Sequence, residues 1–188
     1  MLGLQGDVRE HARLIEAAGA TAVVVKHAEE IDEIAGLIVP GGESTTIGKL
    51  LDRFGMLGPI RERSRAGLPL YGTCAGAILM ASEVRGGEPV PHSIGVMDIA
   101  IVRNAYGRQV DSFETDLDVR GFDGSLRSVF IRAPVIEEVG SEVEVLAAYE
   151  DHPVLVRQDG MLASTFHPEI AGDERVHRLF MELIEEAG

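Results

Sequence analysis

The chain has 188 residues, 45% hydrophobic and 26% charged, a length and balance that predict one globular domain over residues 1–188. Its formal net charge of −14 makes phosphate backbones and anionic lipids poor partners, so we expect no binding to nucleic acid or membrane. Cys74 is the single cysteine, which excludes an internal disulfide and a cysteine-based zinc site. The sequence shows no bilayer-spanning apolar run and no signal-peptide pattern at its start, so we expect a cytoplasmic protein.

The first half of the chain alternates short apolar runs with amphipathic segments. The runs 23–25, 37–39 and 68–71 lack polar alternation, which is typical of strands buried on both faces in a parallel sheet. Apolar periodicity predicts helices over 7–18 and 44–54, the second of which opens with serine and threonine capping residues. This alternation of strand and helix predicts a doubly wound α/β sheet.

The second half is predicted mainly as strands, for example over 97–102 and 128–131. The turn at 158–160 predicts a hairpin that joins 153–157 to 161–165. An antiparallel section on a parallel core is a common mixed design. We therefore expect an α/β fold in three layers around a doubly wound mixed sheet.

A final helix is predicted over 173–186, where Val176, Phe180 and Leu183 belong to one apolar stripe. His177 is assigned to a position off that stripe, so we expect its side chain to be exposed.

Cys74 lies in a segment flanked by glycines, Gly72 to Gly76, between a predicted strand and an apolar helical segment. A sharp strand-to-helix turn pushes the central side chain out of the sheet, and small neighbours leave room for it. The positive end of the helix favours the thiolate, and the amide of Ala75 can point at a developing oxyanion. A lone cysteine is more often a buried structural residue, but this setting favours a nucleophile.

A reactive thiol needs a base, and the base needs a group that orients it. Among the six histidines, only His167 has a carboxylate two residues later, in Glu169. In extended backbone these two side chains point to the same side, and Pro168 favours that geometry for His167. Taken alone, His-Pro-Glu is better explained by a surface turn. Together with the Cys74 turn it predicts a Cys–His–Glu triad, and we expect the other histidines to be surface or packing residues.

The loop from Pro40 to Thr46 contains two glycines and follows a predicted strand, at the sheet edge where α/β proteins bind ligands. Glycines let the backbone approach a ligand closely and expose its amides. The loop lacks the Gly-Lys-Ser/Thr element of a phosphate-binding P-loop. It is either a tight turn with a helix cap or a substrate loop whose amides complete an oxyanion hole and hold an amino acid.

Together these segments resemble the class I, triad-type glutamine amidotransferases, in which the cysteine precedes a His-x-Glu motif near the end of the chain. Nearly the whole chain is similar to the glutaminase subunits of pyridoxal 5'-phosphate synthase. Six segments carry this resemblance: 4–11, 40–46, 72–76, 103–114, 130–134 and 166–169. The segment 103–114 is the most specific, because general amidotransferases do not carry it. The chain begins a few residues short of that family's usual first strand, so we expect the packing of this strand to differ.

The resemblance implies a class I glutamine amidotransferase-like (flavodoxin-like) architecture and hydrolysis of L-glutamine to L-glutamate and ammonia. It implies Cys74 as the nucleophile, His167 as the general base and acid, and Glu169 as the group that orients it. Glutamine contacts are implied for Gly42, Glu43, Ser44, Arg103, Ile131 and Arg132, and oxyanion contacts for Gly42 and Ala75. An arginine that faces the glutamine α-carboxylate would act as a bidentate clamp. Taken alone, either arginine is better explained by a surface ion pair, and no metal or cofactor is implied.

The short stretch after Glu169 predicts no second catalytic domain, so we expect a separate protein to accept the ammonia. The resemblance implies that this partner is the synthase subunit, an oligomer of (β/α)8 barrels. Gln5 to His11 would form part of the contact, and docking would complete the oxyanion hole.

Three alternatives compete with this interpretation. The first, a glutaminase of another pathway such as imidazole glycerol phosphate synthase, is disfavoured by 103–114. The second, a catalytically silent regulatory module, is disfavoured by the complete triad. The third, a cysteine hydrolase or chaperone-like protein of similar architecture, would not need the 40–44 loop beside His-Pro-Glu.

Overall fold

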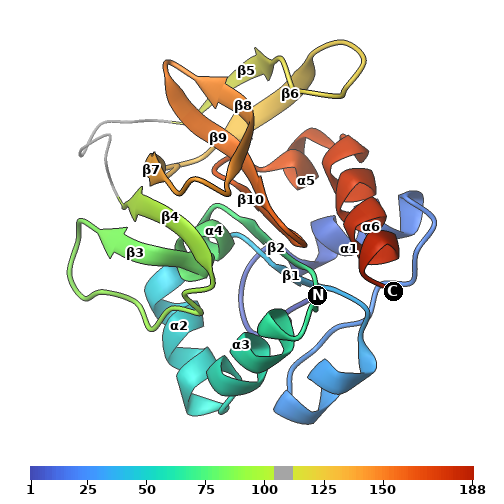
Figure 1. Ribbon diagram of the computed structural model, residues 1–188, viewed down its shortest axis with the longest axis vertical. Helices are drawn as coiled ribbons and strands as arrows, with labels where there is room; N and C mark the ends of the chain where they lie inside the picture. Colours follow the sequence, from blue (N-terminus) through green and yellow to red (C-terminus); the bar gives the residue numbers. More distant parts are fainter. Residues whose placement is uncertain (104–111) are drawn as a thin grey trace.

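The computed structural model describes residues 1–103 and 112–188, and its centre is a five-stranded mixed sheet (Figure 1). The strand order is β1-β2-β10-β9-β8. β1, β2 and β10 are parallel, whereas β9 is antiparallel to both of its neighbours. The strands are β1 (Leu37–Val39), β2 (Leu70–Thr73), β8 (Glu144–Tyr149), β9 (His152–Gln158) and β10 (Met161–Ser164).

Side chains of this sheet alternate between two hydrophobic cores. Successive residues of a strand point to opposite faces, so Leu70 enters one core and Tyr71 enters the other. β10 repeats the pattern, with Ala163 in the first core and Leu162 in the second. Both faces of the sheet are therefore covered, which explains why its strands lack polar alternation.

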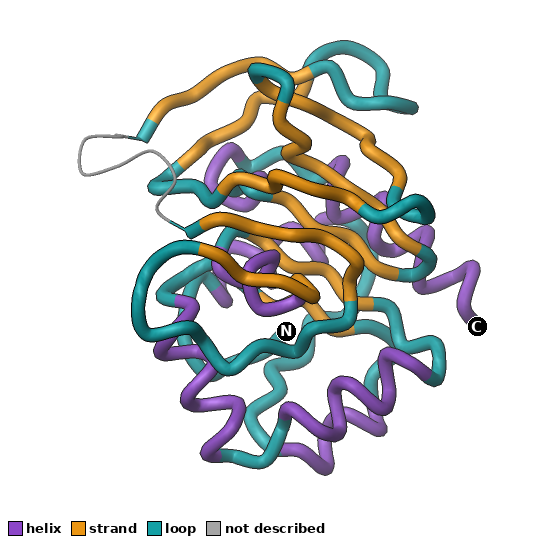
Figure 2. The backbone as a smooth tube through the Cα atoms, turned by 60° about the vertical axis from the view of Figure 1, so that its left-hand side comes forward, coloured by secondary structure: helices purple, strands orange, loops and turns teal. Residues whose placement is uncertain are grey.

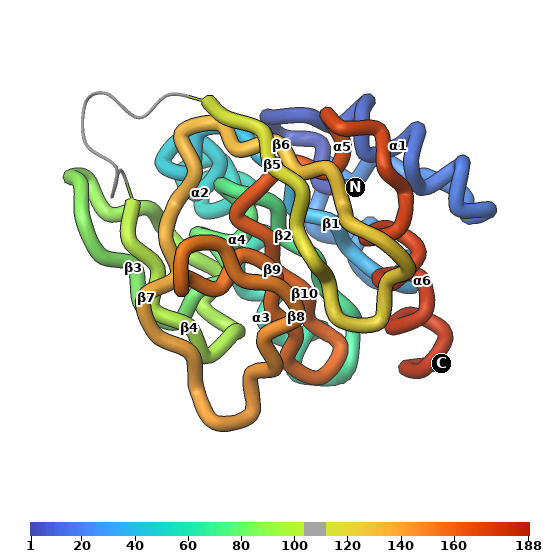
Figure 3. The backbone as a smooth tube through the Cα atoms, turned by 90° about the horizontal axis from the view of Figure 1, so that it is seen from above, coloured from blue at the N-terminus to red at the C-terminus, as the bar shows by residue number. Residues whose placement is uncertain are grey.

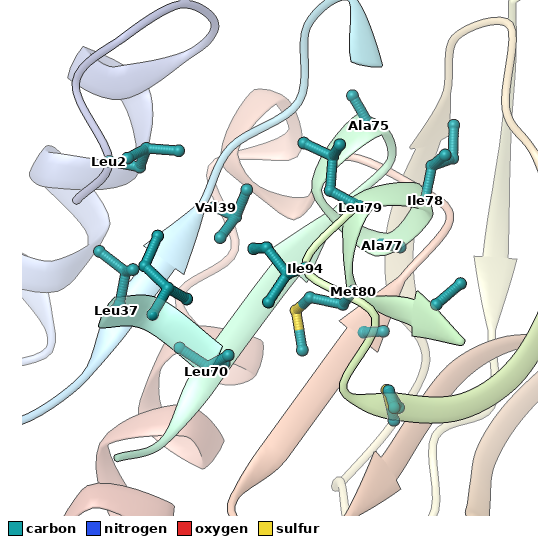
Figure 4. Packing of buried hydrophobic residues seen from close by; sticks show 14 of the residues in the cluster. Leu2, Leu37, Val39, Leu70, Ala75, Ala77, Ile78, Leu79, Met80 and Ile94 are labelled. Atoms are coloured by element: carbon teal, nitrogen blue, oxygen red, sulfur yellow. The ribbon is translucent and has the colours of Figure 1, made fainter. Parts of the chain in front are cut away.

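Helices cover the first face and bury its apolar side chains. They are α2 (Ser44–Arg53), α3 (Leu57–Arg65), α4 (Ala75–Met80) and the 3-10 helix η1 (Ala28–Glu33). Figure 4 shows Val39 and Leu70 from the sheet together with Leu79 and Met80 from α4, all in this core.

Two helices cover the second face, and they lie on the opposite side of the sheet in Figure 1. α1 (Val8–Ala17) contributes Ile15, and α6 (Arg175–Ala187) contributes Val176, Phe180 and Leu183 to the second core. The fold therefore has the three layers that the sequence predicted.

Two smaller sheets extend the central one, and in Figure 2 the strands lie together through the middle and top of the molecule. One has the order β3-β4-β7 and comprises β3 (Ala81–Arg85), β4 (Met97–Val102) and β7 (Val135–Val139). The other is an antiparallel pair of β5 (Phe113–Leu117) and β6 (Leu126–Phe130). β6 packs against the short helix α5 (Pro168–Ala171), which Figure 3 shows near the end of this pair.

The structure agrees with most of the expected elements. The hairpin around Asp159 and Gly160 is present as β9 and β10, and the strand at 97–102 is β4. The apolar run 23–25 is the exception, because it forms only a single parallel bridge between Val25 and Leu2. Val23 and Val24 are half exposed, so the expectation of a strand buried on both faces was wrong there.

The first residues nevertheless pack into the sheet edge. Leu2 is fully buried, and its amide donates to the carbonyl of Ile38 at 2.9 Å. The amide of Gly3 donates to Val25 at 2.7 Å, and the Met1 amine donates to Val23 at 2.7 Å. Met1 to Gly3 thus lie between β1 and the segment around Val25 without forming a regular strand.

His177 is completely buried, so its expected exposure was wrong. It precedes Phe180 by three residues and Ile184 by seven, which are the spacings of one helical face. The side chain therefore lies at the edge of the apolar stripe of α6 and faces the core.

Within 1–103 and 112–188, no helix has both the length and the apolar character needed to cross a bilayer.

Candidate active site

Cys74 occupies a strained turn between β2 and α4. Its backbone has φ 48° and ψ −99°, a conformation that residues other than glycine rarely adopt. The flanking glycines allow this turn. A Cβ on Gly72 would lie 2.7 Å from the Ala77 amide nitrogen, and one on Gly76 would overlap the Val39 carbonyl oxygen. The cysteine is 7% exposed, and its amide donates to the Ser164 carbonyl at 2.8 Å, which ties the turn to β10.

His167 and Glu169 follow β10 and lie at the start of α5. His167 is the N-cap residue, and its amide donates to the Val129 carbonyl at 2.8 Å. Its Nδ1 lies 2.6 Å from Oε1 of Glu169, and both side chains are buried. Sequence reasoning placed the pair on extended backbone, but Pro168 begins a helix and Glu169 lies in its first turn. The pair forms because this turn brings Glu169 back beneath the imidazole.

The charges of the triad are coupled. Burial lowers the pKa of His167, but hydrogen bonds with Cys74 and Glu169 outweigh it and raise that pKa to about 10. Burial raises the pKa of Glu169, and the hydrogen bond with His167 acts in the opposite direction. The ring therefore holds a proton between the thiol and the carboxylate, as a nucleophile, base and orienting acid require.

A pocket of about 490 Å³ opens above Cys74 and His167. Every residue expected to contact substrate or the oxyanion lines it: Gly42, Glu43, Ser44, Ala75, Arg103, Ile131 and Arg132. Glu169 lies behind His167 and does not line the pocket. The structure thus brings all the predicted site residues together, although their individual roles stay predictions.

The glycine loop is held by side chains from two other segments. The Gly41 amide donates to Thr73 Oγ1 at 2.9 Å, and the Glu43 amide donates to Gln5 Oε1 at 2.8 Å. Gly42 has φ 150°, and a Cβ there would lie 2.5 Å from the same Gln5 oxygen. The loop can take this conformation against Gln5 because residue 42 is glycine.

Glu43 also caps a helix, a role that the sequence analysis assigned to the serine and threonines that follow it. It is the N-cap of α2, and its carboxylate accepts from the amides of Thr45 at 3.0 Å and Thr46 at 2.7 Å. Burial acts to raise the pKa of Glu43, but a hydrogen bond from the Thr46 hydroxyl at 2.6 Å, together with the two amides, prevails and lowers it to about 2. The sequence left two interpretations of this loop open. The structure shows that it is a turn with a helix cap and that it also forms one wall of the pocket.

The two candidate arginines differ in setting. Arg103 is 11% exposed, and its guanidinium donates to the Pro89 carbonyl at 2.9 Å and to Thr45 Oγ1 at 3.1 Å. Arg132 is exposed and has φ 47°, a strained backbone at the pocket wall. Arg103 also lies 3.9 Å from a carboxylate oxygen of Glu43, which is an ion pair at the pocket wall, and both arginines line the pocket.

Four further residues line the pocket that sequence reasoning did not place there: Asp7, Ile78, Pro134 and Ile170. Asp7 lies 3.7 Å from His167 Nδ1, and burial raises its pKa. Asp7 and Pro134 belong to two of the segments that carry the family resemblance, 4–11 and 130–134. The sequence alone does not show whether such a residue lines the pocket or contacts a partner. Asp7, His167 and Glu169 also present possible metal ligands within 4.8 Å of one another, but Nδ1 of His167 is already bonded to Glu169.

The sequence model of the SNO glutamine amidotransferase family matches residues 1–186. The chain belongs to this family. The most specific segment of the expected resemblance, 103–114, lies largely outside the described residues, since 104–111 are not described.

Similar proteins extend this assignment over the full length. The pyridoxal 5'-phosphate synthase subunit PdxT of Mycobacteroides abscessus is 54% identical over 184 residues, which cover 98% of this chain and 95% of that protein. The PdxT subunit of Frankia casuarinae is 55% identical over 189 residues, covering 100% of this chain and 95% of that protein. The resemblance inferred from the sequence is thereby confirmed.

Solved structures confirm the predicted fold class. A crystal structure of a glutamine amidotransferase matches with a TM-score of 0.92 and 51% identity, covering 98% of this chain and 97% of that one. A putative GMP synthase component from Thermoplasma acidophilum matches with a TM-score of 0.68 at 16% identity, covering 98% and 92%. At 16% identity, the match to the Thermoplasma acidophilum structure supports the fold only.

Proposed function

We propose that this family member hydrolyses L-glutamine to L-glutamate and ammonia at the pocket above Cys74. The observation that carries the proposal is the convergence of Cys74, His167 and Glu169, with Nδ1 of His167 2.6 Å from the carboxylate, beneath a pocket in a glutamine amidotransferase chain. A pocket of about 490 Å³ also has ample room for one amino acid.

The reaction proceeds in two halves. The Cys74 thiolate attacks the side-chain amide carbon of glutamine, and the amides of Gly42 and Ala75 stabilise the oxyanion. His167 donates its proton to the leaving nitrogen, the carbon–nitrogen bond breaks, and ammonia leaves a thioester on Cys74. His167 then takes a proton from water, the resulting hydroxide attacks the thioester, and glutamate departs as the thiolate reforms. Each missing oxyanion donor costs about 3 kcal/mol of barrier.

The substrate is held by its amino-acid end. Arg103 and Arg132 supply positive charge for the α-carboxylate, and Ile131 supplies a backbone carbonyl for the α-ammonium. Gly42, Glu43 and Ser44 form the facing wall. This assignment is supported by the position of all six residues in the lining of one pocket.

Ammonia passes to a partner subunit. The relatives at 54% and 55% identity are named as subunits of pyridoxal 5'-phosphate synthase, and we assign this chain the same place beside a (β/α)8 barrel synthase. Ammonia released into water would be protonated and lost as a nucleophile, so direct transfer is needed. The cytoplasmic location expected from the sequence stays a prediction.

Docking is expected to complete the oxyanion hole. The Glu43 amide is bonded to Gln5, and the Gly41 amide is bonded to Thr73, so the loop is held in one conformation on both sides of Gly42. Gln5 belongs to the segment that we expect to contact the partner. A partner that moves Gln5 therefore changes the loop that supplies an oxyanion donor.

The test measures glutamate release from glutamine by the purified chain, with and without a pyridoxal 5'-phosphate synthase barrel subunit. We expect strong activation by the barrel, and loss of turnover in Cys74→Ala with glutamine binding retained in calorimetry. Turnover in Cys74→Ala would refute the nucleophile. Full activity that is indifferent to the barrel would keep the glutaminase but remove this pathway, in favour of another synthase.

A further inference from the structure

A second buried polar cluster lies directly behind the triad. It joins His11 of α1, Thr73 of β2 and His177 of α6 to Glu169. His11 Nδ1 is 2.8 Å from His177 Nε2, and His11 Nε2 is 3.1 Å from Thr73 Oγ1. Three of its residues carry no role in the reaction proposed above, yet all are fully buried.

One oxygen of the Glu169 carboxylate lacks a hydrogen bond. Oε1 is bonded to His167, whereas Oε2 is buried without a hydrogen-bond partner among the described residues. The nitrogen His11 Nε2 lies 3.5 Å from Oε2. A buried carboxylate oxygen without a donor is costly, and catalytic hydrogen bonds that are long in a free enzyme shorten in the substrate complex.

The proton positions of the two histidines follow from this geometry. If His11 carried its proton on Nδ1, its Nε2 would accept from the Thr73 hydroxyl, its lone pair would also face the carboxylate oxygen 3.5 Å away, and His177 would bury an unpaired N–H at Nδ1. If both rings carry it on Nε2, His177 donates to His11 Nδ1, and the Nε2–H of His11 is shared between Thr73 Oγ1 at 3.1 Å and Oε2 of Glu169 at 3.5 Å. His177 Nδ1 is then a lone pair, and it has no hydrogen-bond partner among the residues that the structure describes.

We propose that His11 is a positioning residue that donates from Nε2 to the free oxygen of Glu169, in the tautomer that His177 imposes. Thr73 links the same nitrogen to the glycine loop, since its hydroxyl also accepts from the Gly41 amide at 2.9 Å. The cluster thus connects the orienting acid of the triad with the loop beside the oxyanion site. This inference deepens the proposed function and rests on it.

The expected effect follows from charge. A donor at Oε2 favours the ionised carboxylate, which stabilises the protonated ring of His167 and through it the Cys74 thiolate. The titratable groups that face His11 are His177 from α6, His167 and Glu169 from α5, Tyr71 from β2 and the Met1 amine. Burial lowers the pKa of both His11 and His177, which keeps both rings neutral as the tautomers require.

The first test needs no variant. Nitrogen-15 NMR of the histidine-labelled chain distinguishes protonated from unprotonated ring nitrogens. We expect neutral His11 and His177 rings, each protonated on Nε2 at neutral pH. A His11 ring protonated on Nδ1 alone would overturn the proposal.

The second test uses Cys74 as the only thiol of the chain. The rate of alkylation by iodoacetamide is measured against pH in the wild type, His11→Leu and His11→Gln. In His11→Leu we expect the pH midpoint of the alkylation rate to move upward, because the N–H that faces Oε2 of Glu169 is lost. Gln keeps an amide donor near Nε2, so His11→Gln should restore most of the shift. The exposed His152→Gln is the matched control and should leave the midpoint unchanged.

The outcomes separate a positioning role from a structural one. A midpoint that stays at the wild-type value in a folded His11→Leu would overturn the proposal, even if glutamine turnover fell. Should His11→Leu not fold, the tautomers seen by NMR still decide. Neither readout requires glutamine hydrolysis, so failure of the glutaminase assignment is detected separately by the glutamate assay.

Discussion

At the scale of single residues, the site depends on titratable side chains that are buried. Cys74, His167 and Glu169 are each at most 7% exposed, and two further histidines lie in the core behind them. Burying a titratable group makes stability depend on pH, because the unfolded chain titrates at its ordinary pKa. His11 and His177, whose pKa values burial lowers, are therefore residues through which acid should destabilise the fold.

His177 gives the clearest pH prediction. Burial lowers its pKa to about 4, from 6.5 in the unfolded chain. Below pH 6.5 the unfolded state binds a proton at His177, whereas the folded state does not until about pH 4. The free energy of unfolding therefore falls as pH falls from 6.5 to about 4. This one group should remove about 2 kcal/mol between pH 6.5 and 5. Burial also lowers the pKa of His11, which adds to the loss with the same sign.

Urea unfolding at pH 7 and pH 5 measures this loss. His177→Gln has no titrating ring but keeps an amide donor for His11, so its stability should fall less between the two pH values. His152→Gln, at an exposed position, should follow the wild type. Equal losses in His177→Gln and wild type would show that the buried ring is not the source.

Residue roles were only partly predictable from the sequence. Cys74, His167 and Glu169 could be named because flanking glycines and a His-x-Glu spacing restrict the local backbone. His11 was left open as a surface or packing residue, although Val8 and Ile15 lie three residues before it and four after it, on the same helical face. Its contacts with Thr73 and Glu169 join residues that are 62 and 158 positions apart, and no local pattern reports such contacts.

At the scale of elements, the nucleophile turn depends on how closely α4 approaches β1. Gly76, in the first turn of α4, lies against the Val39 carbonyl, and a Cβ there would overlap that oxygen. The backbone carbonyl cannot rotate away as a side chain would. Any larger residue at 76 must therefore move α4, and with it the strained backbone of Cys74.

Gly76→Ala should consequently lose about 3 kcal/mol of stability, as overpacked sites do. A displacement of Cys74 by about 1 Å should also lower the turnover of glutamine by about 100-fold. Gly58→Ala is the control, because Gly58 lies in α3 and an added methyl group would meet nothing within 4 Å apart from its chain neighbours. Alanine is the better helix former, but Pro59 follows and disfavours helical backbone for a residue with a Cβ, so that control should change the stability by less than about 1 kcal/mol. Chemical unfolding and the glutamate assay measure both effects, and a stable, active Gly76→Ala would contradict the argument.

Elements were predicted best where burial on both faces leaves a continuous apolar run. β1, β4 and the hairpin of β9 and β10 were found this way. The run at 23–25 looks the same in sequence, but Val23 and Val24 are half exposed at the sheet edge. A run of three apolar residues cannot distinguish the centre of a sheet from its edge, because pairing depends on distant strands.

At the scale of the whole molecule, one sheet serves two cores. Leu51 of α2 is buried in the first core and Leu183 of α6 in the second, with the strands of the central sheet between them. Because Leu70 and Tyr71 are neighbours on β2 and enter different cores, neither core can open without disturbing the strand that they share. The single domain predicted from the sequence should therefore unfold as one cooperative unit.

Substitutions in the two cores test this cooperativity. Leu51→Ala and Leu183→Ala should each cost about 3 kcal/mol by leaving a cavity. Each should lower the urea midpoint seen by circular dichroism, with an unchanged dependence on denaturant. Hydrogen exchange near that midpoint should report the same transition in peptides from α2 and from α6, whichever core carries the substitution. If Leu51→Ala instead released α2 while α6 kept the wild-type midpoint, the two cores would be independent units. The triad, whose cysteine and histidine follow neighbouring strands of the shared sheet, would then lie on the boundary between them.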